Sequence, residues 1–542
     1  MAPSQARRRR SPEPTGPVPG GYRVRVGWLL RINRLYGEDE SAAVAVQFGR
    51  RFSGTCLHRP VDGPTISHWE AGSRPAGHLA IRGYEHLLRL PSRTLVAVAD
   101  AARSMDDGPA PLDAFDPGEA ETEQRTEDLL HRALEGDVLD GGDWTDLTGT
   151  LRAMPSVMLF PRATWSRLAE RLLDEMIIAE STGWLQRMEA LHSLLRHPKG
   201  QPAVVHAVGD LVRDSTNQVF VDPLTLLEPA DHPEATRHLL RQIADPTNDH
   251  AWRGAWCSVA EKIRRDQFSP SELDTLSRQA ADLLSGNEPH PGCRVAAAEL
   301  LRQTRADVAS RFAGVLRKAA DEDAVTRHVL RRGRMATAEA TTVVIGRLAG
   351  QAVSRLPRDG QAKDPTLEVL LEEMLFHPQV SRRLLAAQFI EATPYRTLIA
   401  GSLVAELRKG AVSSPTLTCS ILQALSTLGD PDARPSVENL VVASGMPPEV
   451  AEAAAWSLAH LRGESPAVFW SAALTRYLGN APAGPSPLSR SAARGLVYGL
   501  GISRDTSMLR QVSSNVAAEP AVRAAAAWWL NKPRHVLDST SR

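Results

Sequence analysis

A short hydrophilic segment from Pro64 to Pro75 carries the side chains best suited to contact another macromolecule. Its sequence, PTISHWEAGSRP, predicts a helix, because proline suits a first helical turn and Gly72 suits the exit. Ile66 and Trp69 are three residues apart and share one face of that helix. The outward side chains are Thr65, Ser67 and His68. Hydroxyl and imidazole groups can hydrogen-bond base edges, and a helix of this size fits the major groove of DNA.

The same segment resembles the helix-turn-helix family of phage repressors and Cro proteins, known as the XRE family. The residues that carry the resemblance are Ile66, Ser67, Trp69, Glu70, Gly72 and Pro75. It implies that Ile66 and Trp69 lie in the core with Gly72 at the helix exit, and that Glu70 holds internal polar contacts. The residues expected to face the bases are Pro64, Thr65, Ser67 and His68. The residues expected to contact phosphates are Arg50, Arg51 and Arg74.

Amphipathic helices flank this segment. Apolar periodicity predicts one helix over Tyr22–Tyr36 and another over Ser41–Phe52, the latter capped by Ser41. Members of the family enter the recognition helix after a shorter turn, whereas this chain inserts GTCLHRPVDG, residues 54–63. Two more helices are expected in LAIRGYEHLLRL and SRTLVAVADAAR. The prediction is therefore a five-helix domain over residues 22–105.

Basic residues are concentrated in this predicted domain. The whole chain is neutral, with 63 Lys and Arg against 63 Asp and Glu. The first 105 residues nevertheless contain 16 arginines, no lysine and 8 acidic residues, a formal charge of +8, and the remainder carries −8. A local positive charge favours contact with phosphates, because counterion release supplies much of the affinity of proteins for DNA.

The segments on either side of the domain have the composition of unpacked chain. Residues 1–21 combine Arg7–Arg10 with a Pro/Gly-rich stretch, typical of a disordered basic arm, and lack the apolar run of a signal peptide. Residues 106–124 are acidic and rich in Pro and Gly, typical of a flexible linker. No run of 18 apolar residues predicts a membrane span. Four dispersed cysteines do not form a disulfide framework, which favours a cytoplasmic location.

Prolines that begin helices recur along the rest of the chain. The predicted starts are Pro198, Pro233, Pro291, Pro378, Pro415, Pro448, Pro487 and Pro520. The residue six positions after each start is apolar, and so is the residue ten positions after it, except at Gln388. These offsets define one helical face. The last four intervals are 37, 33, 39 and 33 residues, which predicts one helical hairpin per unit and a solenoid.

Two segments of this region, PPEVAEAAAWSLAHLRG and EPAVRAAAAWWLN, resemble HEAT repeats. The resemblance implies stacked helical hairpins over residues 125–535, followed by a tail at 536–542. The predicted fold class is therefore all-α, with an N-terminal five-helix helix-turn-helix domain and a long α-solenoid of HEAT-like hairpins. Such arrays present an extended groove, so an unidentified partner protein is expected to bind there.

Other patterns do not favour catalysis. His–Pro dipeptides at His197, His232, His290 and His377 recur before predicted helices, so they are interpreted as turns. His232 and His238 are six residues apart and do not share a helical face, which excludes a helical zinc pair. Neither a Gly-Lys-Ser/Thr phosphate loop nor a G-x-S-x-G elbow occurs. We expect no catalytic residue, no metal and no cofactor.

These features predict a non-enzymatic, cytoplasmic transcriptional regulator that binds double-stranded DNA and whose array binds a partner protein, without membrane contact. Because one helix-turn-helix domain buries little surface, a homodimer on neighbouring half-sites is expected. Two alternatives stay open. One is a HEAT-repeat interaction scaffold whose first domain does not bind DNA. The other is a HEAT-like DNA glycosylase, for which the sequence offers no candidate acid.

Overall fold

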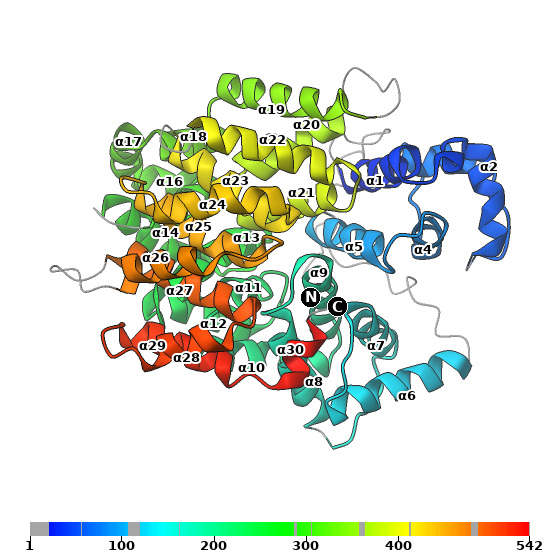
Figure 1. Ribbon diagram of the computed structural model, residues 1–542, viewed down its shortest axis with the longest axis horizontal. Coiled ribbons are helices and arrows are strands. Elements are labelled where there is room, and N and C mark those ends of the chain that lie inside the picture. Colours follow the sequence, from blue (N-terminus) through cyan, green and yellow to red (C-terminus); the bar gives the residue numbers. More distant parts are fainter. Residues whose placement is uncertain are drawn as a thin grey trace, which may run out of the picture.

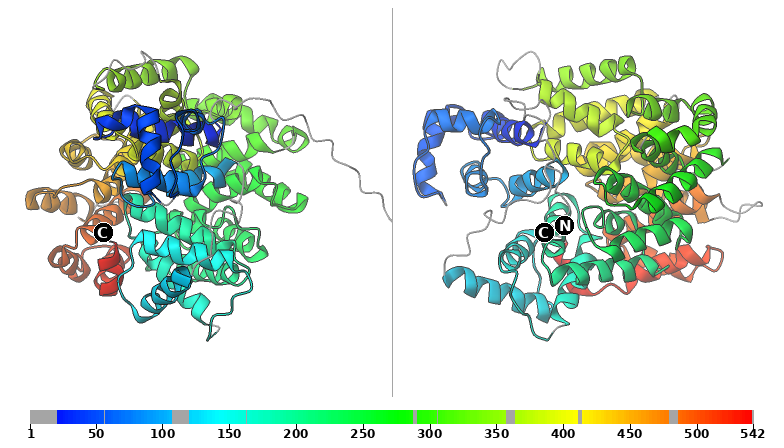
Figure 2. Two further views of the ribbon diagram at one scale, coloured as in Figure 1. Left: turned by 90° about the vertical axis from the view of Figure 1, so that its right-hand side faces the viewer. Right: turned by 180° about the vertical axis from the view of Figure 1, so that it is seen from behind.

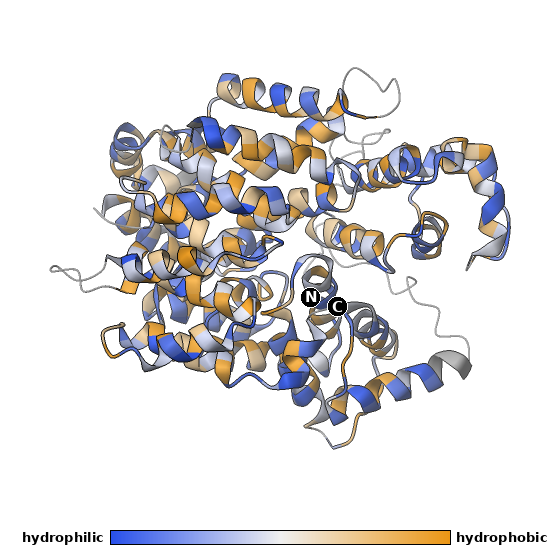
Figure 3. Ribbon diagram, viewed as in Figure 1, coloured by the Kyte–Doolittle hydropathy of each residue, from blue (hydrophilic) through white to orange (hydrophobic). Residues whose placement is uncertain are grey.

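The computed structural model of the 542-residue chain describes residues 21–55, 57–106, 120–161, 163–286, 290–304, 306–356, 364–410, 414–478 and 486–540. Every regular element in these ranges is an α-helix or a short 3-10 helix, and none is a strand (Figure 1). Apolar residues follow stripes along the helices (Figure 3), so most helices have one face for packing. In the same part of the chain, no helix has the length and apolar character needed to cross a bilayer.

The N-terminal unit contains five α-helices and two 3-10 helices. They are α1 (Tyr22–Tyr36), η1 (Glu40–Ala43), α2 (Ala45–Arg50), η2 (Arg51–Gly54), α3 (Gly63–Glu70), α4 (His78–Leu87) and α5 (Thr94–Asp106). The helix expected over Ser41–Phe52 is thus divided into three pieces. Asp39, rather than Ser41, caps the first piece. The Arg34 guanidinium donates hydrogen bonds to the carbonyl oxygens of Ala42 and Ala43, at 3.1 and 2.5 Å. Those two carbonyls therefore bond a side chain from α1 at the point where the helix is interrupted.

The rest of the chain is a succession of helices. They are α6 (Ala120–Glu135), α7 (Gly141–Ala153), α8 (Thr164–Met176), α9 (Ser181–Leu195), α10 (Gly200–Arg213), α11 (Val221–Thr225), α12 (Pro233–Ala244), α13 (Asp249–Arg264), α14 (Pro270–Ser285), α15 (Pro291–Gln303), α16 (Ala306–Arg311), α17 (Ala313–Glu322), α18 (Ala324–Arg332), α19 (Ala338–Val353), α20 (Pro365–Phe376), α21 (Val380–Glu391), α22 (Tyr395–Gly410), α23 (Pro415–Leu428), η4 (Pro431–Ala433), α24 (Arg434–Val442), α25 (Pro448–Ser457), η5 (Leu458–His460), α26 (Ala467–Leu478), α27 (Pro487–Ile502), α28 (Thr506–Ser514), α29 (Pro520–Leu530) and α30 (Arg534–Ser539).

Proline sets the start of most of the predicted repeat helices. The predicted starts at which proline is the first helical residue are Pro233, Pro291, Pro415, Pro448, Pro487 and Pro520. At Pro198 and Pro378 the helix begins two residues later. The fixed φ of proline suits a first turn, and its missing N–H is one that a helix leaves unpaired there.

The apolar face marked by the repeat pattern is buried except at Leu384 and Leu530, which are half-buried. Six residues after the proline, Val204, Leu239, Ala297 and Ala454 have no exposed surface. Gln388, the single polar exception, is also buried, at 5 % exposure.

Adjacent repeats are joined by side chains that reach main-chain carbonyls about one repeat away. Lys262 donates to Ala230 O at 2.7 Å, Arg396 to Leu428 O at 2.6 Å and Tyr477 to Val441 O at 3.0 Å. Leu428 and Val441 lie in the last turns of α23 and α24, where carbonyls have no partner within their own helix, and Ala230 lies in the segment between α11 and α12, so in each case a donor from the neighbouring hairpin satisfies the carbonyl. The recurrence of this bond ties successive hairpins into one continuous array.

The hairpins stack in two layers. In one layer α21, α23, α25, α27 and α29 pack against one another in turn, as do α11, α13 and α15. In the other layer α22 packs on α24 and α24 on α26. This alternation is that of a helical-repeat solenoid.

The array curves until its late helices meet its early ones. Tyr498 of α27 donates to Ile177 O at 3.1 Å, and Lys532 pairs with Asp174 of α8 at 2.8 Å. Helix α30 lies beside α8 (Figure 1).

A buried polar cluster also joins the two halves. Glu452 of α25 bonds His290 of α15 at 3.0 Å and Ser491 of α27 at 2.5 Å, and it pairs with Arg253 of α13 at 3.4 Å. Ser491 in turn bonds His250 at 2.9 Å. Burial alone would raise the pKa of the Glu452 carboxyl, but His290 and Arg253 hold it at about 2. The sequence predicts that a partner protein binds the inner face of the array. At these positions that face is in contact with other helices of the same array.

The N-terminal unit is docked on the array. Arg25 of α1 forms a bidentate pair with Glu373 of α20, both bonds being 2.7 Å long. The Trp28 indole donates to Asp364 at 2.9 Å and stacks on Tyr395, with ring centroids 6.0 Å apart. Helix α5 also contacts α9 and α21, and the unit lies on one side of the array, at the right in Figure 1 and at the left in the right-hand view of Figure 2. The N-terminal unit is therefore held against the array by side-chain contacts of α1 and α5.

The predicted segment boundaries shift at both ends of the array. The basic arm predicted for residues 1–21 lies outside the described residues except for Gly21, and most of the predicted linker does too. Helix α6 already begins within the predicted linker, at Ala120. The predicted tail at 536–542 is wrong up to Ser539, because α30 is helical there and Val536 is buried. Arg187 holds this end by donating to Ser539 O at 2.8 Å.

Candidate nucleic-acid interface

Helix α3 is packed directly on α2 despite the ten-residue insertion before it. The N–H of Val61 donates to Gly49 O at 2.9 Å, which returns the chain to α2. A Cβ atom at Gly63 would lie 2.7 Å from Val46 Cγ2, so the absence of a side chain allows this close approach. Asp62 then caps α3 by accepting the N–H of Thr65 at 2.8 Å.

The inner face of α3 is fixed by hydrophobic packing and a glycine exit. Ile66 has no exposed surface and Trp69 is 9 % exposed, with its ring centroid 6.0 Å from that of Phe52. Gly72 has a φ of +69°, and a Cβ atom there would lie 2.6 Å from Arg23 O of α1. Glycine is therefore required both by the left-handed conformation and by the contact with α1.

Glu70 lies at the centre of a buried network. Its two carboxylate oxygens accept from Arg34 Nε at 2.6 Å and Arg34 Nη2 at 2.7 Å, and the Tyr84 hydroxyl donates to the first oxygen at 2.8 Å. Burial opposes the charge of Arg34, yet the bonds and charge of Glu70 raise its pKa above the usual value.

Burial raises the pKa of the Tyr84 phenol well above its ordinary range, and the Glu70 charge raises it further. Sequence reasoning did not identify Arg34 and Tyr84 as the partners of Glu70. A signal was present, because Arg34 follows buried Leu30 by one turn on the apolar face of α1.

The opposite face of α3 is open to solvent. Pro64, Ser67 and His68 are exposed and Thr65 is half-buried, so the insertion does not cover them. The Ser67 hydroxyl donates to Gly63 O at 3.1 Å within the helix. The imidazole Nδ1 of His68 lies 3.0 Å from Ser73 Oγ, which orients the ring at the end of α3. The four predicted base-facing residues therefore lie on one exposed strip.

The three arginines predicted to contact phosphates are in different environments. Arg50 and Arg74 are exposed. Arg51 is bound within the unit, because its guanidinium pairs with Asp39 at 2.6 Å and donates to Leu87 O at 3.1 Å. A phosphate would have to compete with these contacts at Arg51, whereas Arg50 and Arg74 present their charge to solvent.

Part of the basic excess of the N-terminal residues has acidic partners. Arg34 and Arg51 pair with acids of the unit, and Arg25 and Arg93 pair with Glu373 and Asp146 of the array. A count of charges along the sequence cannot show this pairing. The field available to a phosphate is therefore weaker than the formal charge of +8 suggests.

The four His–Pro histidines all bond a main-chain N–H at the start of a helix. Nδ1 accepts from the residue two positions on, at 3.1 Å for His197, 3.2 Å for His232, 3.0 Å for His290 and 3.1 Å for His377. Burial lowers the pKa of His377 to about 3, so this ring caps its helix in the neutral form. Within the described ranges, no group of three or more His, Cys, Asp or Glu side chains has the arrangement of a metal site.

Comparisons with known proteins give no close relative. Neither a protein-family model nor a curated protein matches the sequence. Among solved structures, the chain is similar to one titled "Crystal structure of Kap121p", with 11 % sequence identity and a TM-score of 0.22. The match covers 95 % of this chain and 50 % of Kap121p, so the chain spans about half the length of that protein. A match this weak carries no argument about function, which therefore has to be inferred from the geometry of the chain.

Proposed function

We propose that α1–α5 form a helix-turn-helix unit of the XRE type that contacts duplex DNA through α3, and that the HEAT-like array serves as a scaffold for a partner protein. The protein would then act as a transcriptional regulator, without enzymatic activity of its own. The observation that carries this proposal is the contrast between the two faces of α3. Its inner face is locked by Ile66, Trp69 and Glu70, while Ser67 and His68 are exposed to solvent and accessible to a ligand.

The dimensions of α3 support groove insertion. Its eight residues make about two turns, and an α-helix with its side chains is about 10–12 Å across. The major groove of B-DNA is about 12 Å wide and admits a helix. Because α3 is already held by the buried network, little conformational entropy would be lost on binding.

The exposed arginines support phosphate contact on this face. Arg50 is the last residue of α2 and Arg74 follows α3, so each can reach a backbone beside the groove. One unit of this size buries too little surface for sequence-specific affinity, so we propose that two copies occupy neighbouring half-sites.

A second candidate function is a scaffold whose N-terminal unit makes no DNA contact. It is favoured by Asp62, whose exposed carboxylate caps α3 at the end that would enter the groove. A negative charge there repels phosphates. The pairing of Arg51 with Asp39 also removes one expected phosphate contact.

Selection of duplexes from a random pool with the full-length protein, followed by salt titration, tests the proposal. We expect log affinity to fall linearly with log salt. His68→Ala should weaken binding to the selected sequence by roughly tenfold and leave nonspecific binding unchanged, whereas Arg74→Ala should weaken both and lower the salt slope by about one. His131→Ala, an exposed histidine on α6, is the matched control.

Absence of salt-dependent duplex binding at 50 mM salt by a folded full-length protein would reject DNA contact and leave the scaffold. Binding that His68→Ala and Arg74→Ala leave intact would place the contact elsewhere. The molar ratio of protein to selected duplex, from ultracentrifugation, tests the two-copy arrangement: a ratio of one would exclude it.

A further inference from the structure

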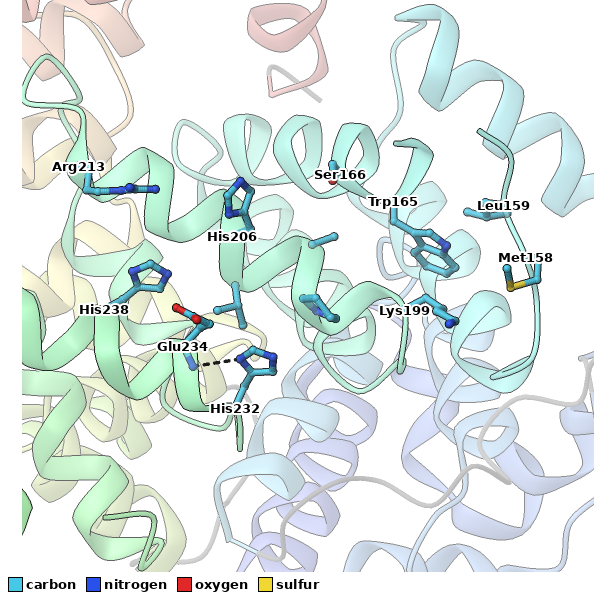
Figure 4. A pocket seen from close by; sticks show the side chains of 13 residues that line it. Met158, Leu159, Trp165, Ser166, Lys199, His206, Arg213, His232, Glu234 and His238 are labelled. Atoms are coloured by element: carbon cyan, nitrogen blue, oxygen red, sulfur yellow. Dashed lines mark hydrogen bonds between the residues drawn. The ribbon is translucent and has the colours of Figure 1, made fainter. Parts of the chain in front are cut away.

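An open groove of about 850 Å³ lies on α8, α10 and α12 and on the segment that precedes α8 (Figure 4). It is separate from α3 and involves no residue of the N-terminal unit. Its two ends differ in chemistry. Figure 4 shows Met158, Leu159 and Trp165 at one end, and His206, His238 and Arg213 toward the other.

The apolar end has a rigid floor and an exposed rim. Trp165 is 7 % exposed and stacks on the buried His197 ring, with centroids 4.4 Å apart. Met158 is 50 % exposed on the rim, and Phe160, two residues further on, is 75 % exposed. Exposed large apolar side chains beside a fixed aromatic floor are typical of an interaction site, because they gain free energy when a ligand covers them.

Hydrogen-bond donors and cationic groups are spread along the groove, and Lys199 lies beside Trp165 and Met158 (Figure 4). His232 Nδ1 accepts the N–H of Glu234 at 3.2 Å, so the ring proton of neutral His232 resides on Nε2, which can donate to a ligand. Lys199 is exposed, and no side-chain partner of its ammonium occurs in the part of the chain that the structure describes.

The acidic side chains in and beside the groove are already paired with basic residues. Glu234, the acid of the lining, is paired with Arg237 at 2.5 Å. Asp210, beside the groove, has its carboxylate 3.1 Å from His206 Nε2 and pairs with Arg213. The free donors of the groove therefore have no acid left to satisfy them, and they suit a ligand that brings carboxylates.

We propose that this groove binds an extended peptide segment of a partner protein, in which a large apolar side chain is followed within a few residues by carboxylates. The apolar side chain covers Trp165 and Met158, and the carboxylates bond Lys199 and His232. The inference rests on the proposed scaffold function of the array and is independent of DNA contact by α3.

The shape of the groove favours a peptide over a small molecule. Small-molecule sites bury most of the ligand surface, whereas this groove keeps Met158 half exposed and the His206 side chain 68 % exposed. Nucleic acid is disfavoured because Arg213 and Arg237 are already paired with Asp210 and Glu234, so the described residues of the groove offer Lys199 but no row of unpaired cations for successive phosphates.

The test is a selection of displayed random dodecapeptides on the full-length protein, followed by anisotropy measurements with the enriched peptides labelled with fluorescein. We expect enriched sequences to combine a large apolar residue with at least two acidic residues. Lys199→Glu and Met158→Glu should each weaken binding at least tenfold. The matched controls Lys318→Glu on α17 and Val468→Glu on α26, both at exposed positions outside the groove, should change it less than twofold.

All four variants change exposed side chains, and circular dichroism checks that each remains folded. No enrichment, enriched peptides without acidic residues, or binding that the groove variants leave intact would each overturn the inference. Duplex binding measured on the same Lys199→Glu protein separates the two proposals, because loss of peptide binding should leave duplex affinity unchanged.

Discussion

Replacement of Glu70 by Gln is the most direct test of how α3 is held. The substitution preserves the shape of the side chain and removes its charge. Arg34 would then keep a guanidinium with only 7 % of its side chain exposed and no carboxylate opposite it. One of the two Glu70 oxygens that accept from the guanidinium would also become an amide NH₂, which cannot accept a hydrogen bond.

The expected cost follows from this geometry. Removing one partner of a buried ion pair typically destabilises a protein by about 3–5 kcal/mol, because the remaining charge is buried without compensation. The Glu70 carboxylate accepts two hydrogen bonds from Arg34, at 2.6 and 2.7 Å, and a third from Tyr84. The buried charges of this pair are therefore well compensated in the parent protein. A loss of about 3 kcal/mol corresponds to a roughly 150-fold increase in the population of the open state.

Hydrogen exchange followed by mass spectrometry measures that population locally. Amides of α3 in Glu70→Gln should exchange about 150-fold faster than in the parent, if local opening governs their exchange. Amides of α25 should be unchanged, because they lie in the array. Glu38→Gln, which removes an exposed acid from the same unit, is the control. Exchange of α3 within threefold of the parent would refute the view that this network holds the helix.

Three further predictions concern other parts of the molecule. Asp62→Asn should keep the cap of α3 and, by removing a negative charge, tighten duplex binding several-fold at 50 mM salt; equal or weaker binding would count against DNA contact on this face. The pKa of Glu452 is depressed to about 2, so its stabilising contribution is complete above about pH 4.5 and is lost as the pH falls toward 2. Urea unfolding at pH 6 and pH 3 should therefore show the parent losing about 2 kcal/mol more than Glu452→Gln, and equal losses would contradict the pairing with Arg253. Gly501→Ala would place a Cβ atom against the Trp529 ring and should lower the free energy of unfolding by about 1–3 kcal/mol. Thermal unfolding measures this effect, and an unchanged melting temperature would contradict the prediction.

Local signals in the sequence account for much of the helical framework. Proline at a first helical position and an apolar face of period 3.6 act within one helix, so they predict α12, α15 and α23 without knowledge of any neighbour. The same logic predicts the repeat, because each hairpin contributes the same kind of buried face. Ser41–Phe52 is the exception, since carbonyls there are taken by Arg34 of another helix.

The candidate interface was predictable only in part. The segment near α3 contains its own apolar face and its own exit glycine, so Ser67 and His68 could be assigned to the outer side from spacing alone. The pairing of Arg51 with Asp39 could not be predicted from spacing, because the fold of the unit brings these two residues together. Contacts of this kind, between residues on different elements, decide whether a basic side chain faces solvent or pairs with an acidic one.

By itself, the sequence determined the all-helical class, the repeat, and the buried face of most helices that begin at a repeat proline, because these follow from interactions over a few residues. Tertiary structure decided how the array closes, as in the pairing of Glu452 with Arg253, and where the N-terminal unit docks, as in the pairing of Arg25 with Glu373. These partners are 199 and 348 residues apart. Such contacts arise because small rotations between successive hairpins accumulate into a curve, and no local pattern of residues encodes where that curve brings the chain back on itself.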